Sequence, residues 1–579
     1  MYILGISCFY HDSAACLLKD GKIISAVQEE RFTRKKHDLS FPANAIKYCL
    51  SEAGIKIDDV SYVGFYEKPF IKFERILTTY IATFPRSFPS FIKAIPLWLH
   101  EKLWIPNIIK TKLGYKGDIL YIDHHLCHAA SSFLVSPFEE AAILTIDGVG
   151  EWETATYGVG RGARIELFKD LSFPHSLGLL YNAFTYYLGF KVNSAEYKVM
   201  GLAPYGKPVY YELIMKELVA LKPDGSFKMN MKYFAYDYGL TMTNKNFYRL
   251  FGRPPRKPET TLEKFHEDVA ASLQKATEEI ILRMANHLYD KTKLENLCLA
   301  GGVALNCVAN GRIVKETKFK NIFIQPASGD AGSAVGVAAY IYNSLLGNKR
   351  SYVMKDAFLG PEYSNDEIKK YLDKNDIEYK KYSPDELIKT SARLINGQKV
   401  VGWFEGRMEF GPRALGARSI LADPRNPDAK NIVNSKIKFR EEFRPFAPTV
   451  LEEKAAEYFD LELPSPFMLL VAQVRPDKRF MPSITHVDGS ARIQTIRKED
   501  NPLYYSLIEE FYRISGCPVV LNTSFNLRGE PLVMTPHDAF LCFMRSGLDH
   551  LVMGNFILDK SRMKALKETV DWKTRFELD

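Results

Sequence analysis

The residues whose types and spacing could hold a metal ion are concentrated in the run at 123–131 (DHHLCHAAS). His124 and His128 are four residues apart, so on a helix both imidazoles would lie on one face, about one turn apart. A histidine pair can also cap a helix or fill a core. Asp147 and Asp330 favour a metal site, because each follows an apolar strand-like run in a Gly-rich turn, where a carboxylate can point into a cleft. Two imidazoles and two carboxylates suit Fe(II), Mn(II) or Zn(II), and such an ion can bind phosphate oxygens and polarise a carbonyl.

Two further segments near the start of the chain hold titratable side chains in turn-like positions. His11 precedes Asp12 in the first acidic turn, where it could act as a general base on a hydroxyl group. The alternative is a turn histidine that is bonded to backbone. Lys36 lies in the run Lys35-Lys36-His37, after the third apolar run. A lysine here could bind phosphate, and the alternative is a solvated run of charges.

The second half of the chain is rich in cations that glycines, prolines and aromatic residues interrupt. The runs lie at 405–419, 436–448, 485–492 and 521–526. None reads as a plain amphipathic helix, and convergent Arg and Lys side chains are a common way to hold phosphate or carboxylate, with Arg supplying paired donors. Asn522 and Ser524 could supply neutral donors and acceptors for an amide-like group. Surface charge remains the alternative for any single cation of this set.

The elements that must position these residues form a repeated pattern of strand, acidic turn and strand. The expected strands are 2–7, 14–18 and 22–27 in the first copy and 142–146, 154–159 and 164–168 in the second. Two copies in one chain indicate an internal duplication. The actin, sugar-kinase and Hsp70 superfold is built in this way, and each half points such a turn at the phosphates of a nucleotide.

Two more units run from an apolar strand into a Gly-rich turn and a helix. Strand 296–299 leads into the turn 300–306, and strand 321–325 leads into 328–336. This arrangement places backbone N–H groups and a helix N-terminus against a negative ligand. A long helical pattern at 263–288 precedes both units.

A domain boundary is expected in the polar stretch at 343–351, giving domains 1–348 and 349–579. The second domain should begin with a helix at 363–373 and a strand at 400–404. A last helix is expected at 535–543, which either closes the back domain or returns to the front one.

Residues 65–116 are rich in aromatics and hold nine Lys and Arg against three acids. The preferred interpretation is an amphipathic helical insertion packed on the front domain. Recognition of an acceptor substrate and contact with a membrane surface are the alternatives.

Composition limits the classes of protein that fit. The 579 residues are 46% apolar and 25% charged, with a net charge of +8 and no long run of one sign, so we expect no nucleic-acid partner. The eight cysteines lack C-x-x-C spacing and are expected to be reduced. No signal peptide and no apolar stretch of about 18 residues is found, so a cytoplasmic protein without a membrane partner is expected. A homodimer is the default assembly.

Together these motifs resemble the NodU/CmcH family of O-carbamoyltransferases, over residues 2 to about 555. The resemblance is carried by residues 9–15, 29–37, 124–131, 147–151, 197–206 (YKVMGLAPYG), 300–306, 328–336, 405–419, 438–448, 485–495 and 522–531. It implies an α/β chain, α+β overall. A duplicated actin-like (ASKHA, TsaD-like) N-terminal domain would precede a YrdC-like C-terminal domain.

The resemblance also implies a two-step reaction. The back domain would convert carbamoyl phosphate and ATP into carbamoyl-adenylate, and the front domain, with iron bound, would pass the carbamoyl group to a hydroxyl of a small-molecule or sugar acceptor. Fe(II) or another divalent metal and ATP are the implied cofactors, with Mg²⁺ as an additional candidate.

By this match, each site residue has an expected role. The metal ligands would be His124, His128, Asp147 and Asp330. His11 would take the acceptor proton, Lys36 would contact the adenylate, and Gly302 and Asn306 would lie on the loop that meets the nucleoside. Carbamoyl phosphate and ATP would be held by Arg413, Lys438, Arg444, Arg492, Asn522 and Ser524.

Three other functions were weighed against this one. A tRNA threonylcarbamoyladenosine-type modifying enzyme has relatives of both halves, but phosphate-backbone binding should bring a more basic surface. An actin-fold sugar kinase would explain the acidic turns but neither the histidine pair nor anything after Val400. A non-catalytic scaffold would not require so many intact site residues. The identity of the acceptor stays open.

Overall fold

The first unit of the computed structural model is built on two five-stranded sheets with the same strand order. One sheet runs β3-β2-β1-β4-β5 and the other β8-β7-β6-β11-β12. In each, the first three strands of the order are antiparallel and the last two join in parallel, so the structure confirms the internal duplication. The strands are β1 (Tyr2–Ser7), β2 (Ala14–Lys19), β3 (Lys22–Gln28), β4 (Val60–Phe65), β5 (Ile119–Tyr121), β6 (Glu140–Ile146), β7 (Glu153–Arg161), β8 (Arg164–Ser172), β11 (Asn296–Ala300) and β12 (Asn321–Ile324).

Burial along these strands explains why the sequence forms them. β1 and β6 are buried at nearly every position and read as continuous apolar runs, as expected for strands covered on both faces. β8 instead alternates between exposed and half-buried positions, as an edge strand with one wet face does.

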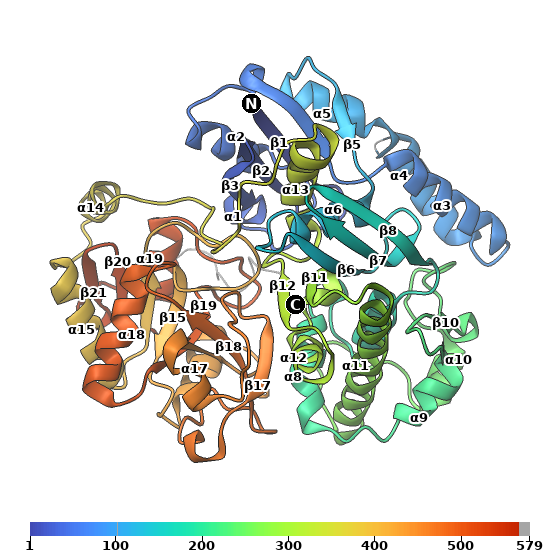
Figure 1. Cartoon of the computed structure of the whole chain (residues 1–579). Coiled ribbons are helices and arrows are strands. Elements are labelled where there is room, and N and C mark those ends of the chain that lie inside the picture. The colour runs from blue at the N-terminus through green and yellow to red at the C-terminus, as the bar shows by residue number, and fades with distance from the viewer. Residues whose placement is uncertain (101, 567–579) are drawn as a thin grey trace. The chain divides into compact units, whose positions relative to one another are not determined.

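Two helices lie between the sheets of the first unit (Figure 1). Helix α13 (Asp330–Ala339) packs on β1 and β2, helix α6 (His124–Phe133) packs on β6 and β11, and the two helices pack on each other. Small residues permit this close approach. A Cβ on Gly336 would lie 1.9 Å from the Cys127 carbonyl oxygen, and one on Gly5 would lie 2.0 Å from the Ala334 carbonyl oxygen.

The remaining helices cover the outer faces and form an insertion. Residues 65–116 form helices between β4 and β5, as expected. The helices are α2 (Ala43–Glu52), α3 (Pro69–Ala82), α4 (Phe88–His100), α5 (Ile105–Leu113), α7 (Leu177–Tyr187), α8 (Glu196–Leu202), α9 (Tyr211–Leu213), α10 (Lys245–Phe251), α11 (Lys264–Thr292) and α12 (Cys307–Glu316), and a hairpin joins β9 (Val219–Leu221) to β10 (Phe227–Met229).

The second unit is built on one nine-stranded mixed sheet, in the order β13-β21-β20-β14-β15-β19-β16-β18-β17. Its strands are β13 (Lys380–Lys381), β14 (Val401–Phe404), β15 (Arg418–Ala422), β16 (Ala447–Leu451), β17 (Leu470–Gln473), β18 (Ser490–Ile496), β19 (Val519–Ser524), β20 (His550–Met553) and β21 (Phe556–Asp559). Its helices are α1 (Glu30–Thr33), α14 (Asn365–Lys374), α15 (Pro384–Asn396), α16 (Ala429–Ile432), α17 (Glu452–Tyr458), α18 (Pro502–Ser515) and α19 (Pro536–Arg545).

A short N-terminal segment belongs to this second unit. The structure describes residues 1–100 and 102–566, and the units are Met1–Glu29 with His37–Met354, and Glu30–Lys36 with the chain from Lys355 onward. Arg34 donates to the Leu532 carbonyl oxygen at 2.6 Å and to Glu530 Oε1 at 3.0 Å. The sequence analysis had placed Glu30–Lys36 in the front domain.

Two other expectations concern the termini and the thiols. Helix α19 packs on β14 and β20 of the second unit, and residues 567–579 lie outside the described part. All eight cysteines are described and buried, and none of them forms a disulfide bond, as their spacing predicted.

The contact between α6 and α13 generates a prediction for Gly336→Ala. The new Cβ would meet backbone of α6, so we expect a loss of about 1–3 kcal/mol in the free energy of unfolding, despite a gain of roughly 1 kcal/mol in helix propensity. Urea titration measures the loss. Gly148→Ala is the control, because a Cβ there meets no atom within 4 Å. Equal unfolding midpoints for the two variants would contradict the packing argument.

Candidate functional site

Three segments of the first unit bring the expected metal ligands together. His124 and His128 lie on α6, Asp147 directly follows β6, and Asp330 is the first residue of α13. The start of α6 is held by Glu151, whose carboxylate accepts from the His124 backbone N–H at 3.1 Å. A carboxylate at this end of a helix is favourable, because the unpaired N–H groups carry partial positive charge.

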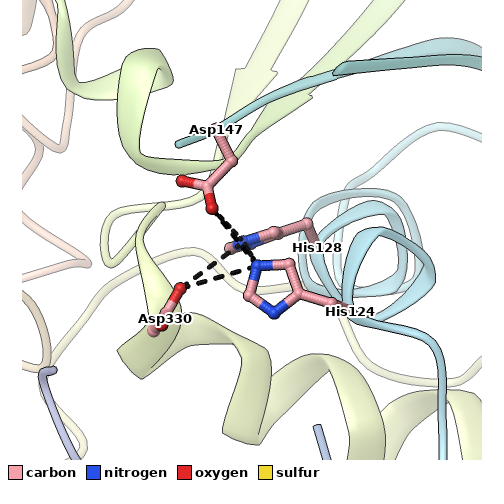
Figure 2. A group of neighbouring side chains, drawn as sticks. All are labelled: His124, His128, Asp147 and Asp330. Carbon is pink, nitrogen blue, oxygen red and sulfur yellow. Dashed lines mark hydrogen bonds and ion pairs between the residues drawn. The ribbon is translucent and has the colours of Figure 1, made fainter. Parts of the chain in front are cut away.

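The four side chains converge on one point (Figure 2). The two Nε2 atoms of His124 and His128 are 3.0 Å apart, and His124 Nε2 lies 3.2 Å from Asp147 Oδ2. Asp330 Oδ1 lies 3.7 Å from His124 Nε2 and 3.8 Å from His128 Nε2. All four side chains are buried, and one ligand atom from each lies within 4.8 Å of the others.

This geometry fits a divalent metal ion. Ligands about 2.0–2.2 Å from one ion are roughly 3.0–3.5 Å apart, which is the spacing seen between the nearest pairs here. Asp330 Oδ1 is buried and accepts no hydrogen bond within residues 1–100 and 102–566. Burying a carboxylate oxygen without a hydrogen bond costs free energy, and a bound cation would offset that cost.

Groups around the ligands fix their orientation. The Gly302 N–H donates to Asp147 Oδ1 at 2.8 Å, and the Tyr66 hydroxyl lies 3.4 Å from Asp330 Oδ2. The Ser333 hydroxyl lies 3.3 Å from His128 Nδ1. Such outer contacts set ligand rotamers and tautomers.

Charges in the cluster shift the pKa values of the ligands. Burial alone would lower the pKa of His124, but the carboxylates of Asp147, Asp330 and Glu151 raise it to about 9. Burial would raise the pKa of Asp147, yet His124 and His128 hold it well below its usual range. The third histidine of the run, His125, is buried and forms a hydrogen bond with Thr145. Burial holds the pKa of His125 well below its usual value.

His11 lies beside this cluster, in a turn that also holds Asp12. His11 Nδ1 donates to Asp12 Oδ2 at 3.0 Å, and its Nε2 lies 3.9 Å from Asp330 Oδ2. The Nδ1–H tautomer leaves the Nε2 lone pair able to take a proton. His37 Nδ1 lies 2.7 Å from the other oxygen of Asp12. Burial opposes protonation of His11, but the carboxylates of Asp330 and Asp12 raise its pKa well above the usual value, so the ring is protonated while those charges are uncompensated. A cation bound by Asp330 would offset that charge and favour the neutral ring, which is the form that can act as a base.

The three residues expected at the adenylate are placed differently from the ligands. Gly302 contacts the four-ligand cluster, because its backbone N–H donates to Asp147. Asn306 caps α12 and exchanges hydrogen bonds with Gln274 at 3.1 Å, so its side chain is used within the fold. Lys36 belongs to the segment that packs in the second unit. Their roles stay predictions.

The second unit brings Lys438 and Ser524 into direct contact. Lys438 is buried, and its ammonium donates to the Ser524 carbonyl oxygen, to Ser524 Oγ at 3.1 Å and to Asn526 Oδ1 at 2.6 Å. Burial, together with the positive charges of Arg440 and Arg444, lowers the pKa of Lys438 well below its usual value. The ammonium is therefore surrounded by four oxygen atoms of Ser524 and Asn526.

Strand register relates Asn522 and Arg492 to Ser524. Asn522 and Ser524 are two residues apart on β19, so both lie on one face of the sheet. Asn522 Nδ2 donates to Gln494 Oε1 at 2.9 Å, and Gln494 is two residues after Arg492 on β18, so Arg492 lies on that same face. The side-chain oxygen Oδ1 of Asn522 is buried and accepts no hydrogen bond from the residues that the structure describes.

Arg413 and Arg444 lie on loops next to this face. The Ala414 carbonyl oxygen, adjacent to Arg413, accepts from Asn522 Nδ2 at 3.2 Å. Arg444 lies 3.7 Å from Glu441, and its charge acts on Lys438. These contacts place the six expected cation and amide residues around one region of the second unit.

Glu409 was missed by the sequence analysis, although it lies inside the quoted run at 405–419. Its buried Oε1 accepts from the backbone N–H groups of Leu415, Ala417 and Arg418 at 2.8, 2.8 and 3.1 Å. An acid inside an arginine-rich glycine loop was the available signal. Arg418 has a structural role, because it donates to the carbonyl oxygens of residues 361, 405, 406 and 417 and stacks on Phe404.

Comparison with known proteins identifies the family. Residues 2–339 match the family model described as Carbamoyltransferase N-terminus, and residues 392–560 match the one described as Carbamoyltransferase C-terminus. The chain therefore belongs to the carbamoyltransferase family and is an enzyme of that family, which confirms the resemblance.

Similar proteins include relatives that span most of the chain. An uncharacterized protein of Synechocystis sp. is 53% identical over an alignment of 613 positions, which covers 100% of both chains. Nodulation protein NolNO of Sinorhizobium fredii is 37% identical over 95% of this chain and 79% of its own. Among solved structures, (R)-2-hydroxyglutaryl-CoA dehydratase component A of Acidaminococcus fermentans is 14% identical with a TM-score of 0.33, over 60% of this chain and 99% of its own. A likeness that weak says nothing about activity.

The raised pKa of His124 predicts a pH-dependent metal affinity. Below about pH 9 the metal-free ring is protonated, so an incoming ion must displace one proton. We expect Co(II) affinity to rise about tenfold per pH unit from pH 6.5 to 8.5. Chelator competition measures it. His124→Ala should bind at least about a hundredfold more weakly, whereas His287→Ala, a control outside the cluster, should match the wild type. An affinity independent of pH would refute the assignment.

The carboxylate of Glu409 predicts a graded effect of two substitutions. Glu409→Ala strands three buried N–H groups, each worth about 1–3 kcal/mol, so we expect a loss of several kcal/mol in the free energy of unfolding. Glu409→Gln keeps an accepting oxygen and should lose less. Thermal and urea unfolding measure both variants. Glu457→Ala, at an exposed side chain, should be neutral. An equal loss for Ala and Gln would show that the three hydrogen bonds matter little.

Proposed function

We propose that the protein is an ATP-dependent O-carbamoyltransferase that works through carbamoyl-adenylate. In the first step carbamoyl phosphate, ATP and water give carbamoyl-adenylate, phosphate and pyrophosphate. In the second step a hydroxyl of a small-molecule or sugar acceptor attacks the carbamoyl carbon, the bond from that carbon to the phosphate oxygen breaks, and AMP leaves. The family supports carbamoyl transfer, and the two sites support the division into steps.

The first step is assigned to the second unit. Its substrates carry phosphates, and Lys438, Arg444, Arg413 and Arg492 are the cations that would hold them, with Arg supplying paired donors. Burial, Arg440 and Arg444 lower the pKa of Lys438, and a bound anion would favour its charged form. The side-chain oxygen Oδ1 of Asn522 could accept from the carbamoyl NH₂.

The second step is assigned to the first unit. His124, His128, Asp147 and Asp330 would hold a divalent ion, with Fe(II) preferred, and when bound it would stabilise negative charge that develops on the carbonyl and phosphate oxygens. His11 Nε2 would take the acceptor hydroxyl proton while Asp12 holds the ring in place. Gly302 and Asn306 would face the nucleoside.

The single observation that carries the proposal is the four-ligand cluster with His11 Nε2 at 3.9 Å from one of its carboxylates. It places a base next to a site that can bind a polarising cation, which is what attack by a hydroxyl on a carbamoyl carbon needs. The assignment covers residues 1–348 for transfer and 349–579, read as YrdC-like, for activation, with Glu30–Lys36 added to the latter.

Substitutions should separate the two steps. The protein is incubated with Fe(II), Mg²⁺, carbamoyl phosphate and ATP, and carbamoyl-adenylate and pyrophosphate are followed by mass spectrometry. We expect Arg444→Ala to abolish both products. We expect His124→Ala and His11→Ala to form carbamoyl-adenylate normally and to transfer it at least about a hundredfold more slowly to an acceptor that the wild type carbamoylates, because a general base alone contributes about 10²–10⁴-fold.

Matched variants make the outcome specific. Arg513→Ala removes an exposed arginine of the second unit and should form carbamoyl-adenylate normally. His124→Ala should also lose its bound metal by elemental analysis, whereas His11→Ala should keep it. Normal transfer by His124→Ala would overturn the metal assignment, and loss of carbamoyl-adenylate in that variant would overturn the division into two sites.

A further inference from the structure

Exposed apolar side chains gather on one part of the first unit. Eight of the seventeen exposed large apolar side chains found in the described residues lie between positions 70 and 104. We call the segment 69–104 the apolar hairpin; it contains α3, α4 and their connection. Ile81 and Phe84, at the connection, are 67% and 68% exposed. A concentration of exposed large apolar side chains in one segment is typical of an interaction site.

Helix α4 carries most of this exposed apolar surface, with Phe88, Ile92, Leu97 and Leu99 all exposed. On α3, Phe70 and Ile81 are exposed, and the other large apolar side chains are half-buried. The two cations of α3 are buried instead: Lys72 lies 2.5 Å from Glu67, and Arg75 lies over the Phe173 ring at 5.1 Å. A surface helix usually exposes its charged side chains and buries its apolar ones, so the exposed apolar side chains of α4 suggest an apolar partner.

Two cations lie on the exposed surface of the apolar hairpin. Arg86 and Lys93 are exposed among the apolar side chains, so they are available to anionic groups next to that face, and Glu74 is the exposed acid among the described residues of the hairpin. Aromatic and aliphatic side chains with interspersed cations are the signature of helices that lie in the interface of an anionic membrane.

The dimensions fit a helix pair that lies on a bilayer and does not cross it. With 14 and 13 residues, α3 and α4 are about 20 Å long, below the roughly 30 Å hydrocarbon thickness. Within residues 1–100 and 102–566, no helix combines the length and apolar character that crossing a membrane requires. In Figure 1 the α3 ribbon extends outward from the rest of the first unit.

We propose that the apolar hairpin docks the protein on the surface of anionic membranes. The apolar side chains from Phe70 to Trp104 would enter the boundary between headgroups and acyl chains, and the exposed cations would meet lipid phosphates. This departs from the sequence-based expectation of no membrane partner, because the sequence did not reveal which face of α3 is buried.

Two other occupants fit less well. In a second copy of the chain, the same hairpin would offer Arg86 and Lys93 one exposed acid, Glu74, whereas an anionic membrane offers many phosphates. The apolar part of a single small acceptor would cover only a few of eight side chains that are spread over two helices.

The residues just before the apolar hairpin connect it to the four-ligand cluster. Tyr66 lies 3.4 Å from Asp330, and the Lys68 N–H donates to Glu151 at 2.8 Å, while Glu151 holds the start of α6. The first residues of the insertion therefore connect the apolar hairpin to the ligands, and membrane docking would hold the first unit with this end toward the lipid surface.

Vesicle sedimentation tests the proposal with the full chain. We expect the wild type to sediment with vesicles of phosphatidylcholine containing 30% phosphatidylglycerol, and far less with phosphatidylcholine alone or at high salt. The triple variant Ile81→Ser, Phe84→Ser, Phe88→Ser should bind the anionic vesicles at least about tenfold more weakly. Arg86→Glu with Lys93→Glu should weaken binding through charge alone. The control is Val209→Ser, Leu240→Ser, Val353→Ser, which removes exposed apolar side chains elsewhere and should bind like the wild type.

Each contrary outcome overturns the proposal. The wild type could fail to bind anionic vesicles, could bind neutral ones equally well, or the triple variant could bind undiminished. If the wild type were a dimer without vesicle affinity and the triple variant a monomer, the apolar hairpin would be a contact between copies. Circular dichroism and Co(II) binding by every variant confirm that a loss of sedimentation is not a loss of folding.

Discussion

The close contact between α6 and α13 is the constraint on which the first unit depends. Each helix packs on its own sheet, and the four proposed metal ligands are carried by α6, by the end of β6 and by the start of α13. A shift between the helices would separate both imidazoles from Asp330, which lies 206 positions after His124 and 202 after His128. Gly336 and Gly5 hold the spacing because any side chain there would meet backbone. The small residues of α13 are therefore a requirement of the site as much as of the core.

The second unit depends on buried charges that backbone groups satisfy. Glu409 accepts three N–H groups of its own loop, and Arg418 donates to carbonyl oxygens around it while burial lowers its pKa to about 10. Removing one partner from such contacts is costly, and a buried charge tolerates few alternative arrangements. The loop between β14 and β15 is in this way held on the face of the sheet that carries Asn522, with Lys438 close by at Ser524.

Local pattern allowed much of this to be predicted. The expected strand 2–7 is β1, and the expected helix 263–288 corresponds to α11 (Lys264–Thr292). Both could be predicted because the spacing of apolar residues and the turn residues that end each element are local features of the sequence. The convergence of His124, His128, Asp147 and Asp330 could be predicted because helical spacing and Gly-rich turns constrain where side chains point. The place of Glu30–Lys36 in the second unit could not be predicted, because docking against distant residues such as Leu532 leaves no local signal. The buried face of α3 could not be predicted either, because the helical repeat of apolar and polar residues does not say which face is buried.

The opposite charges of the two sites follow from chemistry if the proposed function holds. Making a carbamoyl-adenylate requires holding several phosphates, so cations such as Lys438 and Arg444 must surround the substrates. Discharging it requires a cation near the scissile bond and a base that removes a proton, so carboxylates such as Asp147 and Asp330 must hold that cation. The two steps therefore place different demands on their surroundings, because the first holds several phosphates with cations and the second holds a cation with carboxylates. Two separate units can meet both demands, and the lability of the mixed anhydride gives a reason to keep both in one chain.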